Sequence, residues 1–202
     1  NHAAACEGLA WGYPFDIHAK GLDTPANTPV GVVTAIAGQA FLLAHEVTGD
    51  AAFLDDAQRI AHFFLTVIPR MDQDTGVCFA YTPGDTRKVH NANLLTAEHL
   101  LAVWKRTDDA ACLAAAEPAV AYTLSRQRDD GAWPYGEYTA GEPFEPELLR
   151  LVDHHHTGFV LRSLANIHAA RPELGVLEAL HKGWNFYHRH LFSKGGMPIH
   201  DY

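Results

Sequence analysis

The chain has 202 residues and a formal net charge of -9 at pH 7. Its content of 48% hydrophobic and 19% charged residues is ordinary for a soluble globular protein and permits a sizeable core. We expect no nucleic-acid partner, because a phosphate-binding surface needs clustered Lys and Arg and the 15 basic residues form no dense run.

The first two helices that the sequence predicts form a hairpin. Residues 1–27 are rich in Gly, Pro and aromatic residues and are typical of a loop. Residues 30–47 are apolar on nearly all sides, which predicts a largely buried helix starting at the capping pair Thr28-Pro29. Asp50 then caps a helix whose apolar residues lie on one side only. A buried helix, a tight turn and an amphipathic helix together predict an αα-hairpin.

The same pattern recurs twice along the chain. Buried helices are predicted at 91–104 and 153–169, followed by outer helices at 110–124 and 173–192. The inner helices start near 28, 91 and 154, so the period is about 63 residues. A long loop precedes each inner helix, whereas the inner-to-outer turns are short. We therefore expect one domain over 1–202, built from three hairpins with the long loops on one rim.

Each long loop repeats a Gly, an aromatic residue, a Tyr and a carboxylate in that order, and three stretches resemble a poorly characterised α/α-toroid family. That family is akin to the six-hairpin glycosidases, and its genes are common among polysaccharide-biosynthesis genes. The stretches are Trp11-Gly12-Tyr13-Pro14-Phe15-Asp16, Tyr81-Thr82-Pro83-Gly84-Asp85 with His90-Asn91-Ala92-Asn93, and Gly131-Ala132-Trp133 with Asp153-His154-His155-His156-Thr157-Gly158.

The resemblance implies an all-α fold, an α/α toroid, and action on carbohydrate. It runs nearly end to end but lacks the family's first hairpins, so we expect part of a larger toroid. The family has an aromatic residue or Asn before the last His, where this chain has His155. From that motif, only Asp153, His156, Thr157 and Gly158 are therefore carried over.

The candidate catalytic residues combine carboxylates and an imidazole. Glycoside hydrolysis commonly uses two carboxylates across the scissile bond, and an imidazole suits proton transfer near neutral pH. Two such carboxyl groups roughly 5 to 10 Å apart across an open cleft would support hydrolysis. Capping or ion pairing of all of them would favour binding alone, and Asp153 is equally suited to be a helix N-cap. The catalytic candidates are Asp153, His156, Glu137 and Asp85.

The candidate substrate-binding residues are flat or hydroxyl-bonding groups near the predicted rim. Aromatic rings there would stack on sugars, or alternatively wedge the loops against the helix ends. The amides of Asn91 and Asn93 have the same alternative as caps. The candidates are Trp11, Tyr13, Asp16, Tyr81, His90, Asn91, Asn93, Trp133 and Tyr135. We expect no metal site, because three consecutive His at a helix start diverge by roughly 100° each.

Two functions follow as hypotheses. The first is a glycoside hydrolase or lyase-like enzyme that acts on a poly- or oligosaccharide without a cofactor. The alternative is a non-catalytic protein for glycan binding or polysaccharide assembly. We expect a cytoplasmic chain without a membrane segment, because no apolar run reaches roughly 18 to 20 residues. A second copy or a missing N-terminal portion is expected to complete the ring, because half a ring leaves apolar helices exposed.

Overall fold

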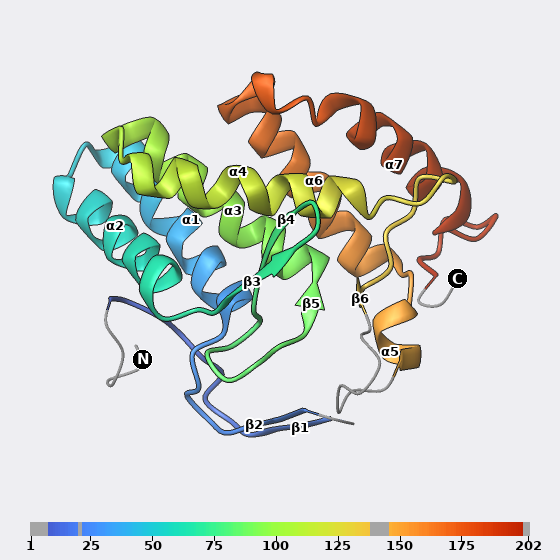
Figure 1. Cartoon of the computed structure of the whole chain (residues 1–202), viewed down its shortest axis with the longest axis horizontal. Helices are drawn as coiled ribbons and strands as arrows, with labels where there is room; N and C mark the ends of the chain where they lie inside the picture. The colour runs from blue at the N-terminus through green and yellow to red at the C-terminus, as the bar shows by residue number, and fades with distance from the viewer. Residues whose placement is uncertain (1–7, 20–21, 138–145, 200–202) are drawn as a thin grey trace.

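Three helical hairpins lie side by side in the computed structural model, which describes residues 8–19, 22–137 and 146–199 (Figure 1). The central helix α3 packs against α1 on one side and α6 on the other, and α2, α4 and α7 each pack against the helix before them. The pairs are α1 (Gly31–Thr48) with α2 (Ala51–Thr66), α3 (His90–Thr107) with α4 (Ala110–Ser125), and α6 (His154–Ala170) with α7 (Leu177–His190).

The helix starts reflect local capping in part. The side chains of Asp50, Asp109 and Asp153 each accept a hydrogen bond from a backbone N–H in the first turn. The predicted cap Thr28 is wrong, because extended Val30 occupies the N-cap position of α1 and donates its N–H to the carbonyl of Trp11. The last outer helix is also shorter than predicted, because Gly175 takes a left-handed conformation between the 3-10 turn η1 (Pro172–Leu174) and α7.

The long loops contain short strands that the sequence did not predict. In Figure 1 the loop segments with β1, β2 and α5 lie toward the lower edge and the β3–β4 hairpin lies near the middle of the view against α4, while the short turns between paired helices lie at the opposite edge. Three antiparallel strand pairs order the loops, and the short helix α5 (Pro146–Arg150) precedes α6. The pairs are β1 (Ile17–Ala19) with β2 (Leu22–Thr24), β3 (Arg70–Gln73) with β4 (Gly76–Phe79), and β5 (Lys88–Val89) with β6 (Gly136–Glu137).

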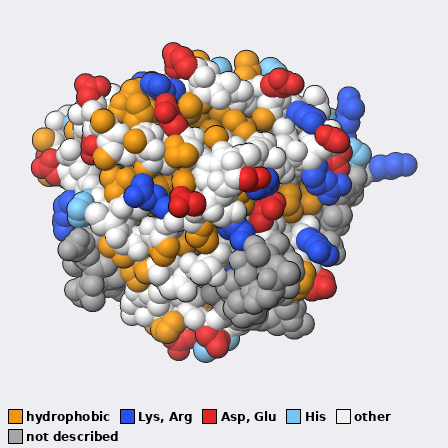
Figure 2. Space-filling model, viewed as in Figure 1, with side chains coloured by type: hydrophobic (Ala, Val, Ile, Leu, Met, Phe, Trp, Pro, Cys, Tyr) orange, Lys and Arg blue, Asp and Glu red, His pale blue; other side chains and the backbone are white. Residues whose placement is uncertain are grey.

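Helix α1 has one buried and one open flank. Ile36, Leu43 and Val47 are 43%, 61% and 76% exposed, although α1 packs against α2 and α3 on its other side. By length and composition alone α1 is apolar enough to cross a membrane, which corrects the expectation that no segment reaches this limit. On the face shown in Figure 2, acidic and basic side chains are interspersed and form no continuous basic area.

A polar cluster ties the three inner helices together. The buried carboxylate of Glu98 on α3 accepts a hydrogen bond of 2.9 Å from Gln39 on α1. From α6 it accepts hydrogen bonds of 2.7 Å each from Ser163 and Asn166. Buried carboxylates are tolerated when their oxygens are satisfied in this way. Glu98 therefore fixes the mutual positions of α1, α3 and α6, which carry the loops of the rim.

A buried histidine makes the fold sensitive to mild acid. His99 on α3 is fully buried and its Nε2 lies 3.0 Å from the carbonyl oxygen of Ala57. Burial lowers its pKa from 6.5 to about 4. As the pH falls below 6.5 the unfolded chain binds a proton that the folded chain does not, so stability is present above 6.5 and is lost toward pH 4. We expect the free energy of unfolding to fall by about 3 kcal/mol over this range.

Urea unfolding at pH 7 and pH 4.5 measures this loss. The variant His99→Gln should lose much less stability between the two pH values than wild type, whatever its stability at pH 7. The exposed His188 is the matched control, and His188→Gln should keep the wild-type pH dependence. Equal pH dependence in His99→Gln and wild type would contradict the assignment.

Candidate functional site

The loops that precede α3 and α6 are joined at the rim. In the antiparallel strand pair β5–β6, Lys88 is the register partner of Glu137 and Val89 that of Gly136. Next to this pair, the backbone N–H of His90 donates to the carbonyl of Tyr135 at 3.1 Å. A side chain at Gly136 would lie 2.5 Å from the carbonyl oxygen of Lys88, so this close approach requires glycine. The pairing brings the start of α3 next to the aromatic and acidic residues of the following loop.

Asp153 and His156 form a dyad at the first turn of α6. One Asp153 oxygen accepts from the His156 N–H at 2.8 Å, and the other lies 2.5 Å from His156 Nδ1. Burial alone would raise the pKa of Asp153, but the bonds from His156 outweigh it and the pKa is lowered. The Asp153 carboxylate is therefore ionised and accepts from Nδ1–H, which leaves Nε2 of His156 free to accept a proton. The His156 side chain is 32% exposed.

A small cavity adjoins this dyad. Its volume of about 10 Å³ is roughly the space of one water molecule, so a sugar ring does not fit inside it. Buried polar atoms line the cavity: Asn91 Oδ1 and both ring nitrogens of His90 have no hydrogen bond among the described residues. Tyr135, Asp153 and His156 complete its polar lining. A ligand would therefore lie across the mouth, where His156 is exposed.

Three half-buried tyrosines lie near one another at the rim, and one of them, Tyr135, lines the cavity. Tyr13, Tyr81 and Tyr135 are close enough for their phenol groups to interact electrostatically, and the Tyr135 ring centroid lies 4.3 Å from that of His156. Burial raises the pKa of the Tyr81 and Tyr135 phenols, so both hydroxyls stay protonated at neutral pH. These residues supply ring faces and hydroxyl donors from three different loops.

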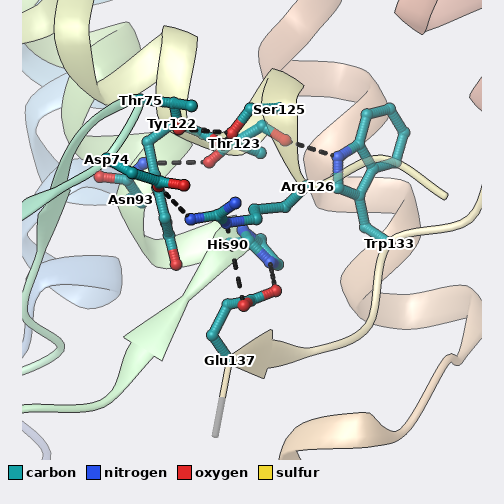
Figure 3. Close-up of polar contacts among 10 residues, drawn as sticks. All are labelled: Asp74, Thr75, His90, Asn93, Tyr122, Thr123, Ser125, Arg126, Trp133 and Glu137. Atoms are coloured by element: carbon teal, nitrogen blue, oxygen red, sulfur yellow. Dashed lines mark hydrogen bonds and ion pairs between the residues drawn. The ribbon is translucent and has the colours of Figure 1, made fainter. Parts of the chain in front are cut away.

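His90, which lines the cavity, also faces Glu137. His90 Nε2 lies 3.7 Å from Glu137 Oε1, and Arg126 Nε lies 3.8 Å from Glu137 Oε2 (Figure 3). His90 chiefly lowers the pKa of Glu137, while burial opposes the lowering and Arg126 and Lys88 add to it. Glu137 is thus an ionised carboxylate held between an imidazole and a guanidinium.

Trp133 and Asn93, predicted to bind substrate at the rim, are instead core residues. Trp133 is 2% exposed and donates its indole N–H to the carbonyl of Thr123 at 2.8 Å. Its ring lies so close to Gly183 that an added Cβ there would be 2.5 Å away. The fully buried Asn93 accepts from the Phe79 N–H at 2.9 Å and donates to the carbonyl of Ala119 at 2.8 Å. Both residues hold the loops to the helices.

Trp11 and Asp16 also stabilise their own loop. The Trp11 ring packs 5.7 Å from that of Phe41 on α1, and its backbone bonds to Thr34. Asp16 is exposed and accepts from the Ala26 N–H at 2.7 Å. Neither residue lines the small cavity.

All four carboxylates in the predicted site are engaged. Asp85 forms a buried ion pair with Arg87, whose Nε donates to Oδ1 at 3.0 Å and to Oδ2 at 2.9 Å while Nη2 donates to Oδ2 at 2.5 Å. Asp153 is an N-cap, Glu137 is ion-paired and Asp16 is bonded within its loop. By the criterion given above, this outcome favours glycan binding over hydrolysis by a pair of these carboxylates. A lyase-like reaction that uses an imidazole as its base does not need such a pair. No three His, Cys, Asp or Glu side chains in the described part of the chain are placed to hold a metal ion.

Solved structures share this arrangement of hairpins. No known protein family and no curated protein matches the chain in sequence. A cellobiose 2-epimerase from Spirochaeta thermophila superposes with a TM-score of 0.69 at 16% identity, covering 98% of this chain and 53% of its own. A GH76 α-mannanase from Bacteroides thetaiotaomicron superposes with a TM-score of 0.66 at 16% identity, over 91% of this chain and 52% of the mannanase. A polysaccharide lyase superposes with a TM-score of 0.63 at 9% identity, over 86% of this chain and 51% of the lyase.

The fold is that of the α/α toroids. This is the fold that the sequence motifs implied, and the chain spans about half the length of these similar structures. The sequence motifs missed Arg87 and Arg126, which hold two of the predicted carboxylates. A single arginine in a loop or at a helix end has no sequence pattern that marks its partner.

Proposed function

We propose that this toroid belongs to a carbohydrate-active enzyme that transfers a proton at a sugar carbon, a lyase-like or isomerising reaction. The Asp153–His156 dyad carries the proposal, because it presents a partly exposed imidazole with a free Nε2 at the rim. By their names, the similar structures include an epimerase, a mannanase and a lyase, which supports a carbohydrate substrate.

The geometry suits abstraction of a proton from a carbon next to a carbonyl group. Asp153 fixes the His156 ring through Nδ1, so Nε2 takes the proton while the electron pair of the C–H bond moves to the carbonyl oxygen. The N-terminus of α6 and the protonated tyrosine hydroxyls favour the negative charge that develops there. A sugar ring stacked on the tyrosines would be placed over His156.

Product analysis tests the reaction class. The purified protein is incubated with neutral reducing oligosaccharides and with uronate-containing oligosaccharides, and the products are identified by mass spectrometry and carbon-13 NMR. An isomerised sugar of unchanged mass, or an unsaturated product, is expected. Shorter saturated products would show hydrolysis and contradict the proposal. Binding without any product would favour the glycan-binding alternative.

We also propose that further helical hairpins, from the same polypeptide or a second copy, pack on the open flank of α1. Exposed apolar area costs about 25 cal/mol per Å², and this flank exposes Ile36, Leu43 and Val47. The isolated 202-residue chain is therefore expected to self-associate in light scattering, and Leu43→Glu should reduce the association. A stable monomer at high concentration would contradict this account.

A further inference from the structure

Arg126 lies between the surface and the inner cavity. It occupies the C-cap of α4, and its Nη2 lies 2.5 Å from Asp74 Oδ1 while its Nε faces Glu137 (Figure 3). Its guanidinium carbon stands 5.1 Å from the centroid of the Tyr122 ring, and that ring packs 5.7 Å from the ring of His90. One arginine thus contacts the outer turn and the carboxylate beside the cavity.

The outer anchor of Arg126 is itself held in place. Asp74 and Thr75 form the turn between β3 and β4, and Thr75 Oγ1 lies 2.6 Å from Ser125 Oγ at the end of α4. Asp74 thus forms an ion pair with Arg126, and the adjacent Thr75 forms a hydrogen bond with the adjacent Ser125. This double contact restricts where the guanidinium of Arg126 can lie.

The contacts of Glu137 are ion pairs longer than hydrogen bonds. Its two oxygens face His90 Nε2 at 3.7 Å and Arg126 Nε at 3.8 Å, and both nitrogens are buried with no hydrogen bond among the described residues. A movement of about 1 Å would bring either donor to hydrogen-bond distance. Contacts of this kind often tighten when a substrate binds.

The other ionisable groups around Glu137 come from three elements. Lys88 lies on the paired strand β5, Cys78 on β4, and Tyr122 on α4. Burial raises the pKa of the Cys78 thiol to about 12 and also raises that of the Tyr122 phenol, so both are neutral near pH 7. Lys88 and Arg126 are therefore the cations that act on Glu137, and His90 is its imidazole neighbour.

We propose that Arg126 is a positioning residue: anchored by Asp74 and the Tyr122 ring, it holds the Glu137 carboxylate toward His90, whose side chain lines the small cavity together with Asp153 and His156. The catalytic consequence rests on the function proposed above. Because His90 lines the small cavity together with Asp153 and His156, the placement of Glu137 acts through His90 on the alignment of a sugar with His156. The positioning itself does not depend on the reaction.

The test compares Arg126→Met with Arg128→Met. Arg128 is two residues away, exposed, and pairs with Asp130 at 2.7 Å. Carbon-13 NMR follows the titration of the Glu137 carboxyl group in each protein. In Arg126→Met the Glu137 midpoint should rise by a few tenths of a pH unit, the size expected for a partly exposed ion pair, whereas Arg128→Met should match wild type. Turnover should fall in Arg126→Met with little change in KM.

A second variant and a separate readout distinguish the possible failures. Asp74→Asn removes only the exposed anchor, so it should fold normally and shift the Glu137 midpoint in the same direction by less. Unchanged Glu137 titration in both variants, even with a lower melting temperature, would overturn the positioning role. A shifted midpoint in a protein that turns over no sugar would support the positioning role and overturn the proposed function instead.

Discussion

Replacing His156 with glutamine is expected to lower turnover by about 10²-fold to 10⁴-fold, the usual contribution of a general base. Glutamine keeps a polar side chain near Asp153 but cannot accept the proton. Because the tyrosine surfaces stay in place, KM should change much less than kcat. Steady-state kinetics with the substrate found by product analysis would measure both constants.

His155 is the matched control for this substitution. It is the adjacent residue on α6, is exposed, and its ring packs edge-on 5.1 Å from the ring of Phe159. His155→Gln should keep turnover within a few-fold of wild type. Equal losses in the two variants would assign the effect to the helix start, and an unaffected His156→Gln would remove His156 from the reaction.

Replacing Trp133 with alanine is expected to destabilise the fold by about 3 to 5 kcal/mol, the usual cost of emptying a buried aromatic site. The ring packs against Gly183 of α7, and its indole N–H donates to the carbonyl of Thr123 on α4. Denaturant unfolding at neutral pH measures the loss.

Trp184, which lies on α7 next to Gly183, is the matched control. It is 54% exposed on α7, so Trp184→Ala should cost far less than Trp133→Ala. If Trp133→Ala kept wild-type stability and lost glycan binding instead, Trp133 would be a rim residue after all.

The helical hairpins could be predicted because their signals are local. Apolar periodicity, helped by the capping residue Asp153 at α6, placed the inner helices within three residues of their observed bounds, and Asp50 marked the start of the outer helix α2. The pairing of β5 with β6 could not be predicted, since its residues lie far apart in sequence and each strand has only two residues. The late start of α7 was also not predicted, because the apolar pattern does not show that Gly175 takes a left-handed conformation and ends the 3-10 turn η1.

The site was predictable only where its contacts are close in sequence. Asp153 and His156 are three residues apart at a helix start, so a motif can contain both. Trp133 and Trp11 share a loop pattern with Tyr13 and Tyr81, yet the pattern does not state which ring faces the core. Arg126 meets Asp74 and Glu137 only after three separate elements have packed together.

Exchange of solvent hydrogen tests the central claim most directly. The protein is incubated in D2O with a sugar from the product screen, and deuterium at each carbon is measured by NMR. If the product is an isomerised sugar, proton transfer through His156 predicts deuterium at one carbon of the sugar with wild type and with His155→Gln, and much slower incorporation with His156→Gln. If the product is unsaturated, the proton is removed and not replaced, so the prediction is a much slower formation of that product with His156→Gln alone. Isomerisation without deuterium at any carbon, or equal rates with wild type and His156→Gln, would contradict the account.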